Sequence, residues 1–276
     1  MATASALARV VAKRKKGGTE PLTFGMTFPF STHNYQLRFW MAAGGVDPDE
    51  DVRLVVLPPP YMVDSLASGQ VDAFCVGAPW NSVAVDLGVG QILHFVSDIL
   101  VRAAEKVLAV RQNWSDKNPD VLAALIRSAS RAAEFIEQPE NRAEAAKLLS
   151  QPDRIGVDAE VIQRTLDGRL KISPDGTMRQ SGRYLLVGRE GAARPEPVQA
   201  AWLYAQMVRW GQTAYSPDAL KTAMGVFRPD LYDAALGRDR KAAGTSEAIG
   251  AFAGPPFNPD DIAGHLAAFA IRRQKA

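Results

Sequence analysis

Residues 22–98 alternate between short apolar runs and helical patterns, and this alternation is the strongest constraint on the fold. The runs TFGMTF, DVRLVVLPP, VDAFCVG and QILHFVSDI have the composition of strands. The segments 33–43, 59–69 and 79–90 between them have the spacing or end signals of helices. Strands separated by helices predict βαβ units and therefore an α/β fold with a parallel or mixed sheet.

The chain changes character after Asp98. One more strand is expected at KVLAVRQNW, residues 106–114, and helices dominate from there on. The longest expected helix covers 118–135, and its apolar spacing predicts an inward face made of Val121, Leu122, Leu125, Ile126, Ala129 and Ala133. Further elements are an extended loop over 172–195 and helices at 143–150, 158–166, 197–212 and near 262–271.

These patterns divide the chain into three parts. Residues 1–21 form a basic tail and linker, residues 22–98 an α/β unit, and residues 99–276 a helix-rich segment with few strands of its own. The net charge of +2 and the even spread of both signs indicate no nucleic-acid surface. The apolar runs are shorter than the roughly 20 residues that a membrane-spanning helix needs.

The N-terminal residues and the cysteine content bear on the cellular compartment. The apolar run near the start precedes the basic cluster 13–16, which is the reverse of the order in a secretory signal. The single cysteine, Cys75, excludes an intramolecular disulfide and is expected to be a buried thiol. We therefore expect a cytoplasmic protein, or a periplasmic one if a leader preceded this sequence.

One strand-to-helix corner gathers polar groups. TFGMTF leads into Ser31, Thr32 and His33, and the helix that follows ends at Gly44, which fits the left-handed position after a helix. Orphan N–H groups and the helix dipole attract small anions, and hydroxyl and imidazole groups can donate hydrogen bonds to them. A capping role alone for Ser31 or Thr32 explains the same residues.

Lys106 is a second candidate for a ligand contact. It opens the apolar run KVLAV. Its ammonium group either faces a cleft between two lobes or extends along apolar surface into water. The spacing of residues by itself does not decide between these two positions.

Other motifs give no support for a metal, a cofactor or catalysis. DPDEDV carries carboxylates at alternate positions, but Val52 and Pro58 stand where a calcium-binding EF-hand loop needs Gly and Glu. His94 and His265 have no partner at metal-ligand spacing. No nucleophile–base pattern is present. We therefore expect a protein without metal or cofactor that is not an enzyme.

Four segments carry a family resemblance: STHNYQLRFWMAAGG followed by DP, the PPPYM turn, SG-VDAFCVG-PWN, and KVLAV. Together they resemble the nitrate/bicarbonate-binding branch of the type-2 solute-binding proteins of ABC transporters, over most of residues 22–236. The resemblance implies two α/β lobes with a ligand cleft between them. Residues 22–98 then correspond to lobe two, and 99–276 to the returning, helix-rich part of lobe one. The opening part of lobe one has no counterpart, so the first lobe is expected to be incomplete.

The resemblance also assigns roles to individual residues. In nitrate-binding members, a histidine at the start of the lobe-two helix contacts the anion and a lysine on the returning strand neutralises it. The matching residues are His33 and Lys106, with Thr32 or the backbone near it as a third contact. Bicarbonate-binding members have an acid at the lysine position that helps to hold calcium. Lys106 therefore favours nitrate or nitrite, whereas Glu105 beside it would reverse the choice after a shift of one residue.

Several functions are compatible with this resemblance. One is delivery of nitrate or nitrite to an ABC transporter permease, and another is a cytoplasmic sensor that acts on an antiterminator regulatory protein. Binding of bicarbonate or a sulfonate is an alternative. A further alternative is an enzyme on the same fold, such as a pyrimidine-precursor synthase, although the single Cys75 argues against that enzyme.

The affinity of the expected site follows from its contacts. Micromolar binding requires about 8 kcal/mol. A helix terminus supplies roughly 0.3–2 kcal/mol and a charge-assisted hydrogen bond about 1.5–3 kcal/mol, so His33 and Lys106 alone fall short. We therefore expect this chain to bind nitrate weakly or not at all.

Overall fold

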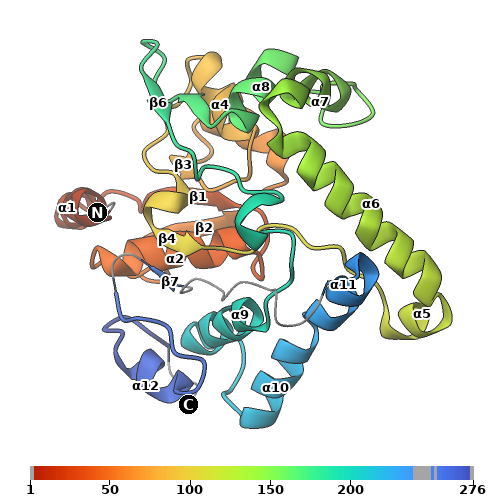
Figure 1. Cartoon of the computed structure of the whole chain (residues 1–276). Coiled ribbons are helices and arrows are strands. Elements are labelled where there is room, and N and C mark those ends of the chain that lie inside the picture. Colours follow the sequence, from red (N-terminus) through yellow and green to blue (C-terminus); the bar gives the residue numbers. More distant parts are fainter. Residues whose placement is uncertain (1–2, 239–249, 252–253, 274–276) are drawn as a thin grey trace.

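The computed structural model describes residues 3–238, 250–251 and 254–273, and its organising element is a small parallel sheet (Figure 1). Strand β1 (Thr23–Met26) lies in the middle, between β2 (Arg53–Val56) and β3 (Ala73–Phe74). Both neighbours run parallel to β1, and Phe24 is paired with Leu54 on one side and with Ala73 on the other. The expected α/β organisation of this part of the chain is confirmed.

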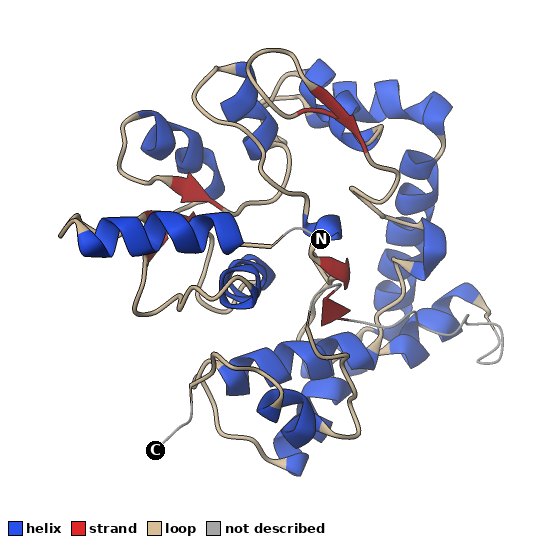
Figure 2. Ribbon diagram, turned by 90° about the vertical axis from the view of Figure 1, so that its left-hand side faces the viewer, coloured by secondary structure: helices blue, strands red, loops and turns tan. Residues whose placement is uncertain are grey.

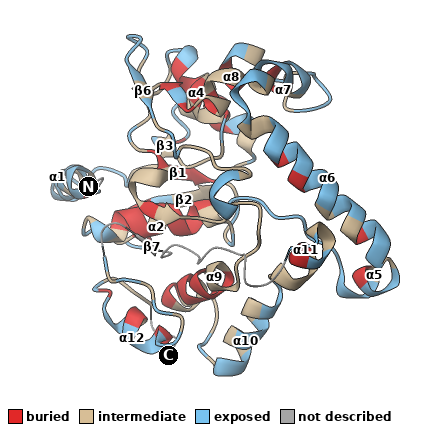
Figure 3. Ribbon diagram, viewed as in Figure 1, coloured by how far each residue is buried: buried red, intermediate tan, exposed pale blue. Residues whose placement is uncertain are grey.

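Helix α2 (Thr32–Ala43) follows β1 and is buried on two sides. Leu37 packs with Phe24 of the sheet in one core cluster, whereas Phe39 packs with Trp202 in a second cluster. Eight of the 12 residues of α2 are buried, polar ones included, so the helix needs cover on more than one side. The second cover is α9 (Pro197–Arg209), which is also largely buried (Figure 3).

The remaining helices of residues 22–98 follow the other strands. After β2, a 3₁₀ turn leads into α3 (Met62–Ala67), and α4 (Trp80–Asp86) follows β3. These helices lie where the sequence predicts them. The prolines before α3 occupy the turn that precedes the helix, where a missing N–H costs nothing.

Two expected strands are not formed in the described part of the chain. Residues 91–99 contain a 3₁₀ turn, Val96–Asp98, and strand β4 (Leu100–Arg102) begins only after it. β4 pairs antiparallel with β7 (Gly250–Ala251). The segment 106–110 forms neither helix nor strand and has no strand partner among the described residues, and Val107 and Leu108 are exposed. An apolar run becomes a strand only when a neighbouring backbone satisfies its hydrogen bonds.

The N-terminal helix α1 (Ser5–Lys16) buries one face. Ala4 and Val11 join the core cluster formed by the sheet and α2. Ala4 approaches Gly44 so closely that a Cβ at Gly44 would lie 2.4–2.6 Å from it. Gly44 is therefore required by packing, and its φ of −94° is not left-handed. Gly45, with φ +84°, takes the conformation expected for Gly44, so that expectation was wrong.

The chain beyond β4 is mainly helical, with short strands (Figure 2). The expected helices are present, and the expected loop over 172–195 contains a short strand and a 3₁₀ turn, Arg189–Gly191. The elements not yet named are α5 (Gln112–Lys117), α6 (Pro119–Glu137), α7 (Arg142–Leu149), α8 (Ala159–Leu166), β5 (Arg169–Lys171), β6 (Met178–Gln180), α10 (Pro217–Gly225), α11 (Pro229–Leu236) and α12 (Ile262–Ala267).

Helix α6 is less buried than its sequence predicts (Figure 3). Leu122 and Ala133 are buried, but Val121 is 51% and Leu125 42% exposed. Ala129 is exposed as well. The prediction of a continuous inward face was therefore wrong for Val121, Leu125 and Ala129. Periodicity identified the helix and its apolar side, but the described residues cover only part of that side.

Crossing a membrane demands a helix of about 20 mostly apolar residues. Among the helices that the structure describes, none is both long and apolar enough to span a bilayer.

Candidate functional site

The start of α2 holds a buried histidine. Ser31 caps the helix by accepting a hydrogen bond from the backbone N–H of Asn34 (3.2 Å). His33 lies in the first turn, and its side chain is only 8% exposed. Its Nδ1 lies 3.3 Å from the hydroxyl of Thr27, and its Nε2 lies 2.8 Å from Oε1 of Glu105. The imidazole therefore joins the end of the first strand to the segment after β4.

Glu105 is the direct partner of this imidazole. Burial by itself would raise the pKa of its carboxyl, but the contacts with His33 and the neighbouring charge of Lys106 outweigh burial and hold the pKa below its usual value. Glu105 is therefore ionised near neutral pH. A negative charge thus lies where the sequence predicts a positive one.

Lys106 reaches the same carboxylate from the solvent side. Its Nζ lies 3.4 Å from Oε1 of Glu105, and its side chain is 80% exposed. His33 and Lys106 therefore both approach one oxygen atom, and that oxygen belongs to Glu105. The structure brings His33 and Lys106, the two predicted anion contacts, to the same carboxylate rather than to a shared open pocket.

Thr32 holds this segment against the helix start. Its hydroxyl donates a hydrogen bond to the backbone carbonyl of Ala104 (2.9 Å). The bond fixes the residue directly before Glu105. In this structure, Thr32 is thus a positioning residue, and its hydroxyl proton is already used.

Backbone donors remain at the corner. No described residue accepts a hydrogen bond from the backbone N–H of Thr32 or of His33. The first N–H groups of an α-helix have no partner within the helix, and together with the helix dipole they favour an anion.

A second layer of residues around Glu105 was not predicted as part of the site. A Cβ added to Gly77 would lie 3.3 Å from Oε1 of Glu105 and 3.5 Å from Nε2 of His33, so the backbone passes close to this contact. Asn81 donates a hydrogen bond to the hydroxyl of Tyr184 (2.9 Å). Burial, and to a lesser extent the charge of Glu105, raises the pKa of Tyr184. Asn81 lies in the PWN stretch that carries the family resemblance, but neither Asn81 nor Tyr184 was predicted as a site residue.

The corner offers little for metal or nucleophile chemistry. Across the described ranges, no group of three or more His, Cys, Asp or Glu residues is arranged to hold a metal ion. Burial, with a smaller contribution from Glu105, raises the pKa of Cys75 to about 12. Cys75 is therefore a protonated thiol at neutral pH, which is a poor nucleophile.

Comparison with known proteins assigns this geometry to a family. The model of the NMT1-like family matches residues 1–150, which is more than half of the 276 residues. The chain belongs to the NMT1-like family. The expected relationship to the nitrate- and bicarbonate-binding proteins is confirmed by its curated relatives.

Three such relatives illustrate the relationship of this NMT1-like chain. It is 30% identical over 273 residues to the nitrate/nitrite binding protein NrtA of Synechococcus elongatus, covering 97% of this chain and 62% of that protein. It is 33% identical over 257 residues to the nitrate import ATP-binding protein NrtC of Synechocystis, covering 91% of this chain and 38% of that protein. It is 30% identical over 261 residues to the bicarbonate-binding protein CmpA of Synechococcus elongatus, covering 90% of this chain and 58% of CmpA. The chain thus spans between about two fifths and three fifths of the length of these relatives.

A solved structure identifies the fold of this NMT1-like chain. The crystal structure of the periplasmic nitrate-binding protein NrtA from Synechocystis matches with a TM-score of 0.89 and 27% sequence identity, covering 98% of this chain and 71% of the NrtA chain. The expected type-2 periplasmic-binding-protein-like α/β fold is confirmed.

Proposed function

We propose that this chain binds a small oxyanion of the nitrate and nitrite type at the start of α2. The observation that carries the proposal is the position of Oε1 of Glu105, which lies 2.8 Å from the imidazole of His33 and 3.4 Å from the ammonium of Lys106. An oxygen that carries negative charge thus already occupies a place between these two side chains. The names of the NrtA relatives support nitrate or nitrite as the external anion.

In this proposal, binding requires an exchange of anions. The external oxyanion replaces the carboxylate of Glu105 beside His33, and the free N–H groups of Thr32 and His33 supply further donors. A planar monovalent anion accepts hydrogen bonds in its plane, so it can take an imidazole N–H and a backbone N–H as donors at the same time. The carboxylate competes with the ligand, so the affinity of the unaltered chain is expected to be low.

Calorimetric titration of nitrate and nitrite into the purified chain tests the proposal. H33Q should weaken binding by about tenfold, because it removes the imidazole donor that lies beside the proposed position of the anion. H94Q is the matched control, since His94 contacts the ring of Trp40 and lies outside the corner. Equal affinity of H33Q and the unaltered chain would remove His33 from the site, and a complete lack of nitrate and nitrite binding would contradict the proposed ligand.

Bicarbonate is the second candidate because an acid, Glu105, lies against His33. In the related bicarbonate-binding branch, an acid at this place is associated with calcium. Calcium takes six to eight oxygen ligands, and no described cluster of acidic and histidine side chains offers such a set. We therefore assign no calcium ion to this site. Titration of bicarbonate with and without Ca²⁺ compares the two ligands directly.

We further infer that the protein is a binding component rather than an enzyme. Its relatives include nitrate- and bicarbonate-binding proteins, and the protonated Cys75 is poorly suited to nucleophilic chemistry. An ABC transporter permease is one partner and an antiterminator regulatory protein the other, the first with a periplasmic location and the second with a cytoplasmic one. Location in cell fractions distinguishes the two roles.

A further inference from the structure

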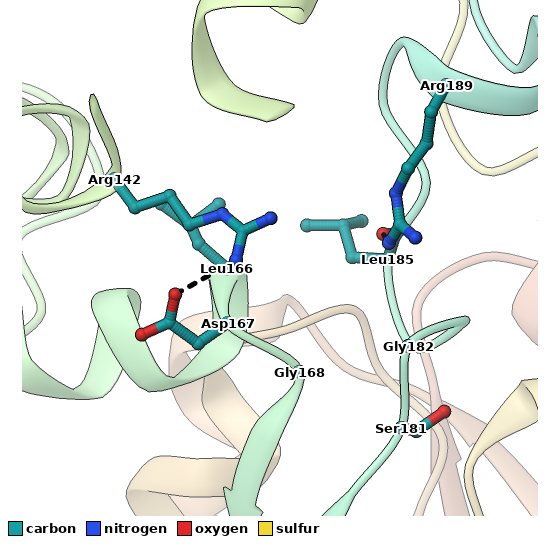
Figure 4. Close-up of a pocket in the computed structure, with 8 residues that line it drawn as sticks. All are labelled: Arg142, Leu166, Asp167, Gly168, Ser181, Gly182, Leu185 and Arg189. Atoms are coloured by element: carbon teal, nitrogen blue, oxygen red, sulfur yellow. Dashed lines mark hydrogen bonds and ion pairs between the residues drawn. The ribbon is translucent and has the colours of Figure 1, made fainter. Parts of the chain in front are cut away.

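A second group of basic side chains lies far in the sequence from the corner at the start of α2 that holds His33. A cavity of about 180 Å³ is formed where the start of α7, the end of α8 and the segment after β6 meet (Figure 4). Its lining includes Arg142, Asp167, Ser181 and Arg189. The two arginines face the cavity from opposite sides (Figure 4).

Each of these arginines is held in place by a carboxylate. Nη1 of Arg142 donates to Asp167 (3.1 Å), and Nη2 donates to the backbone carbonyl of Glu137 (3.2 Å). Nε of Arg189 donates to the carboxylate of Glu137 (2.8 Å), and its Nη2 donates to the carbonyl of Leu185 (3.1 Å). The guanidinium planes are therefore fixed before any ligand arrives, which lowers the entropic cost of binding.

The carboxylate of Glu137 accepts several hydrogen bonds. Its Oε1 accepts hydrogen bonds from the backbone N–H groups of Val187 (2.7 Å) and Gly188 (3.0 Å). Burial would raise the pKa of Glu137, but these donors and Arg189 outweigh it and lower the pKa. Glu137 does not line the cavity, so it supports Arg189 from outside.

Both guanidinium groups keep donor capacity for a ligand. Nη1 and Nη2 of Arg142 each carry two hydrogens; one is donated to Asp167 and one to the carbonyl of Glu137, so one hydrogen on each nitrogen is left. Nη1 of Arg189 makes no hydrogen bond with a described residue. The lining thus carries two positive charges against one negative charge, that of Asp167.

We propose that this cavity binds a short organic dicarboxylate, with one carboxylate at each arginine. Guanidinium groups match carboxylates in charge and planar geometry. Leu166 and Leu185 also line the cavity and provide apolar contact for a short carbon chain. The volume is more than ten times the roughly 10–15 Å³ that one water molecule needs on the same measure, so a ligand of several non-hydrogen atoms fits better than a single small ion. This site is independent of the proposed nitrate site.

Titration of succinate and glutarate into the full chain tests this proposal by calorimetry. Succinate or glutarate should bind with a dissociation constant in the millimolar range or below, and acetate at least about tenfold more weakly, because it can satisfy only one arginine. R189Q should weaken dicarboxylate binding by about tenfold or more. R131Q is the matched control, because Arg131 is exposed on α6 and does not line the cavity, and its affinity should be unchanged.

An NMR titration gives a second readout that does not depend on variant stability. The Nε–H signals of Arg142 and Arg189 should shift together on addition of succinate, while nitrate binding by R189Q should equal that of the unaltered chain. Absence of dicarboxylate binding, equal binding of acetate and succinate, tighter binding of inorganic phosphate, or equal affinity of R189Q and R131Q would each overturn the proposal. Failure of nitrate binding would leave these results unaffected, since the two sites share no residue.

Discussion

The corner at His33 and the cavity between Arg142 and Arg189 both contain basic side chains. They differ in where the neighbouring carboxylates lie. In the corner, Oε1 of Glu105 lies directly against the imidazole, where a ligand oxygen would lie. At the cavity, Asp167 lines the open space and pairs with Arg142, whereas Glu137 holds Arg189 from outside the lining, so Arg189 has no carboxylate on its cavity side.

The comparison shows that the position of a carboxylate, rather than the number of cations, decides what a cationic cluster can do. A carboxylate on the contact face neutralises the cation and competes with a ligand. A carboxylate outside the contact face orients the guanidinium and leaves part of its donor capacity available. At the corner, the contact between His33 and Glu105 must break before a ligand can bind. At the cavity, the guanidinium of Arg189 is already held in position by Glu137.

Removal of the supporting carboxylate should have the largest effect. E137A leaves the backbone N–H groups of Val187 and Gly188 and one side of Arg189 without an acceptor. We expect the free energy of unfolding to fall by about 2–3 kcal/mol, as measured by urea denaturation. E134A on the same helix is the control, because Glu134 is 61% exposed and its contact with Arg238 is long, at 3.8 Å. An equal loss in both variants would show that Glu137 does not support the cavity.

Removal of the competing carboxylate should have an intermediate effect of opposite sign. E105Q keeps the size of the side chain but removes the charge that opposes an external anion beside His33. We expect nitrate affinity to rise by about tenfold, measured by calorimetry, because a neutral amide competes less well for the imidazole. E144Q, an exposed position on α7, is the control. Unchanged or weaker nitrate binding by E105Q would show that the carboxylate assists the ligand instead of competing with it.

Removal of the exposed cation should have the smallest effect. Lys106 is 80% exposed, and interactions between exposed charges are screened by water and salt. K106Q should therefore change nitrate affinity by only about twofold, in contrast to H33Q. A tenfold loss of nitrate affinity in K106Q, measured in the same titration, would show that Lys106 is a principal contact of the anion.

The local elements of residues 22–98 could be predicted to a large extent from the sequence. The three strands of the parallel sheet and the helices between them follow from apolar runs, turn residues and helix end signals. The expected strand at 91–99 was wrong, and the expected strand at 106–114 is not formed. Both runs are apolar, but a strand also needs a partner backbone at the correct distance, and that partner is set by tertiary structure.

The candidate site was only partly predictable. The sequence pointed to His33 and Thr32, because a cap and a histidine at a helix start form a recognisable local pattern. It could not decide which of Glu105 and Lys106 faces His33, since adjacent residues in an extended segment point to opposite sides. Tyr184 is distant in the sequence from the other members, so no local pattern could reveal it.

The sequence by itself thus determined the alternation of strands and helices, the polar helix start at His33, and the family relationship. These properties depend on the periodicity of neighbouring residues and on local motifs. The tertiary structure alone decided that Glu105 lies against His33 and that Arg142 and Arg189 face one cavity. These arrangements bring together residues that lie 72 and 47 positions apart, and only packing in three dimensions sets which side chains come near one another across such separations.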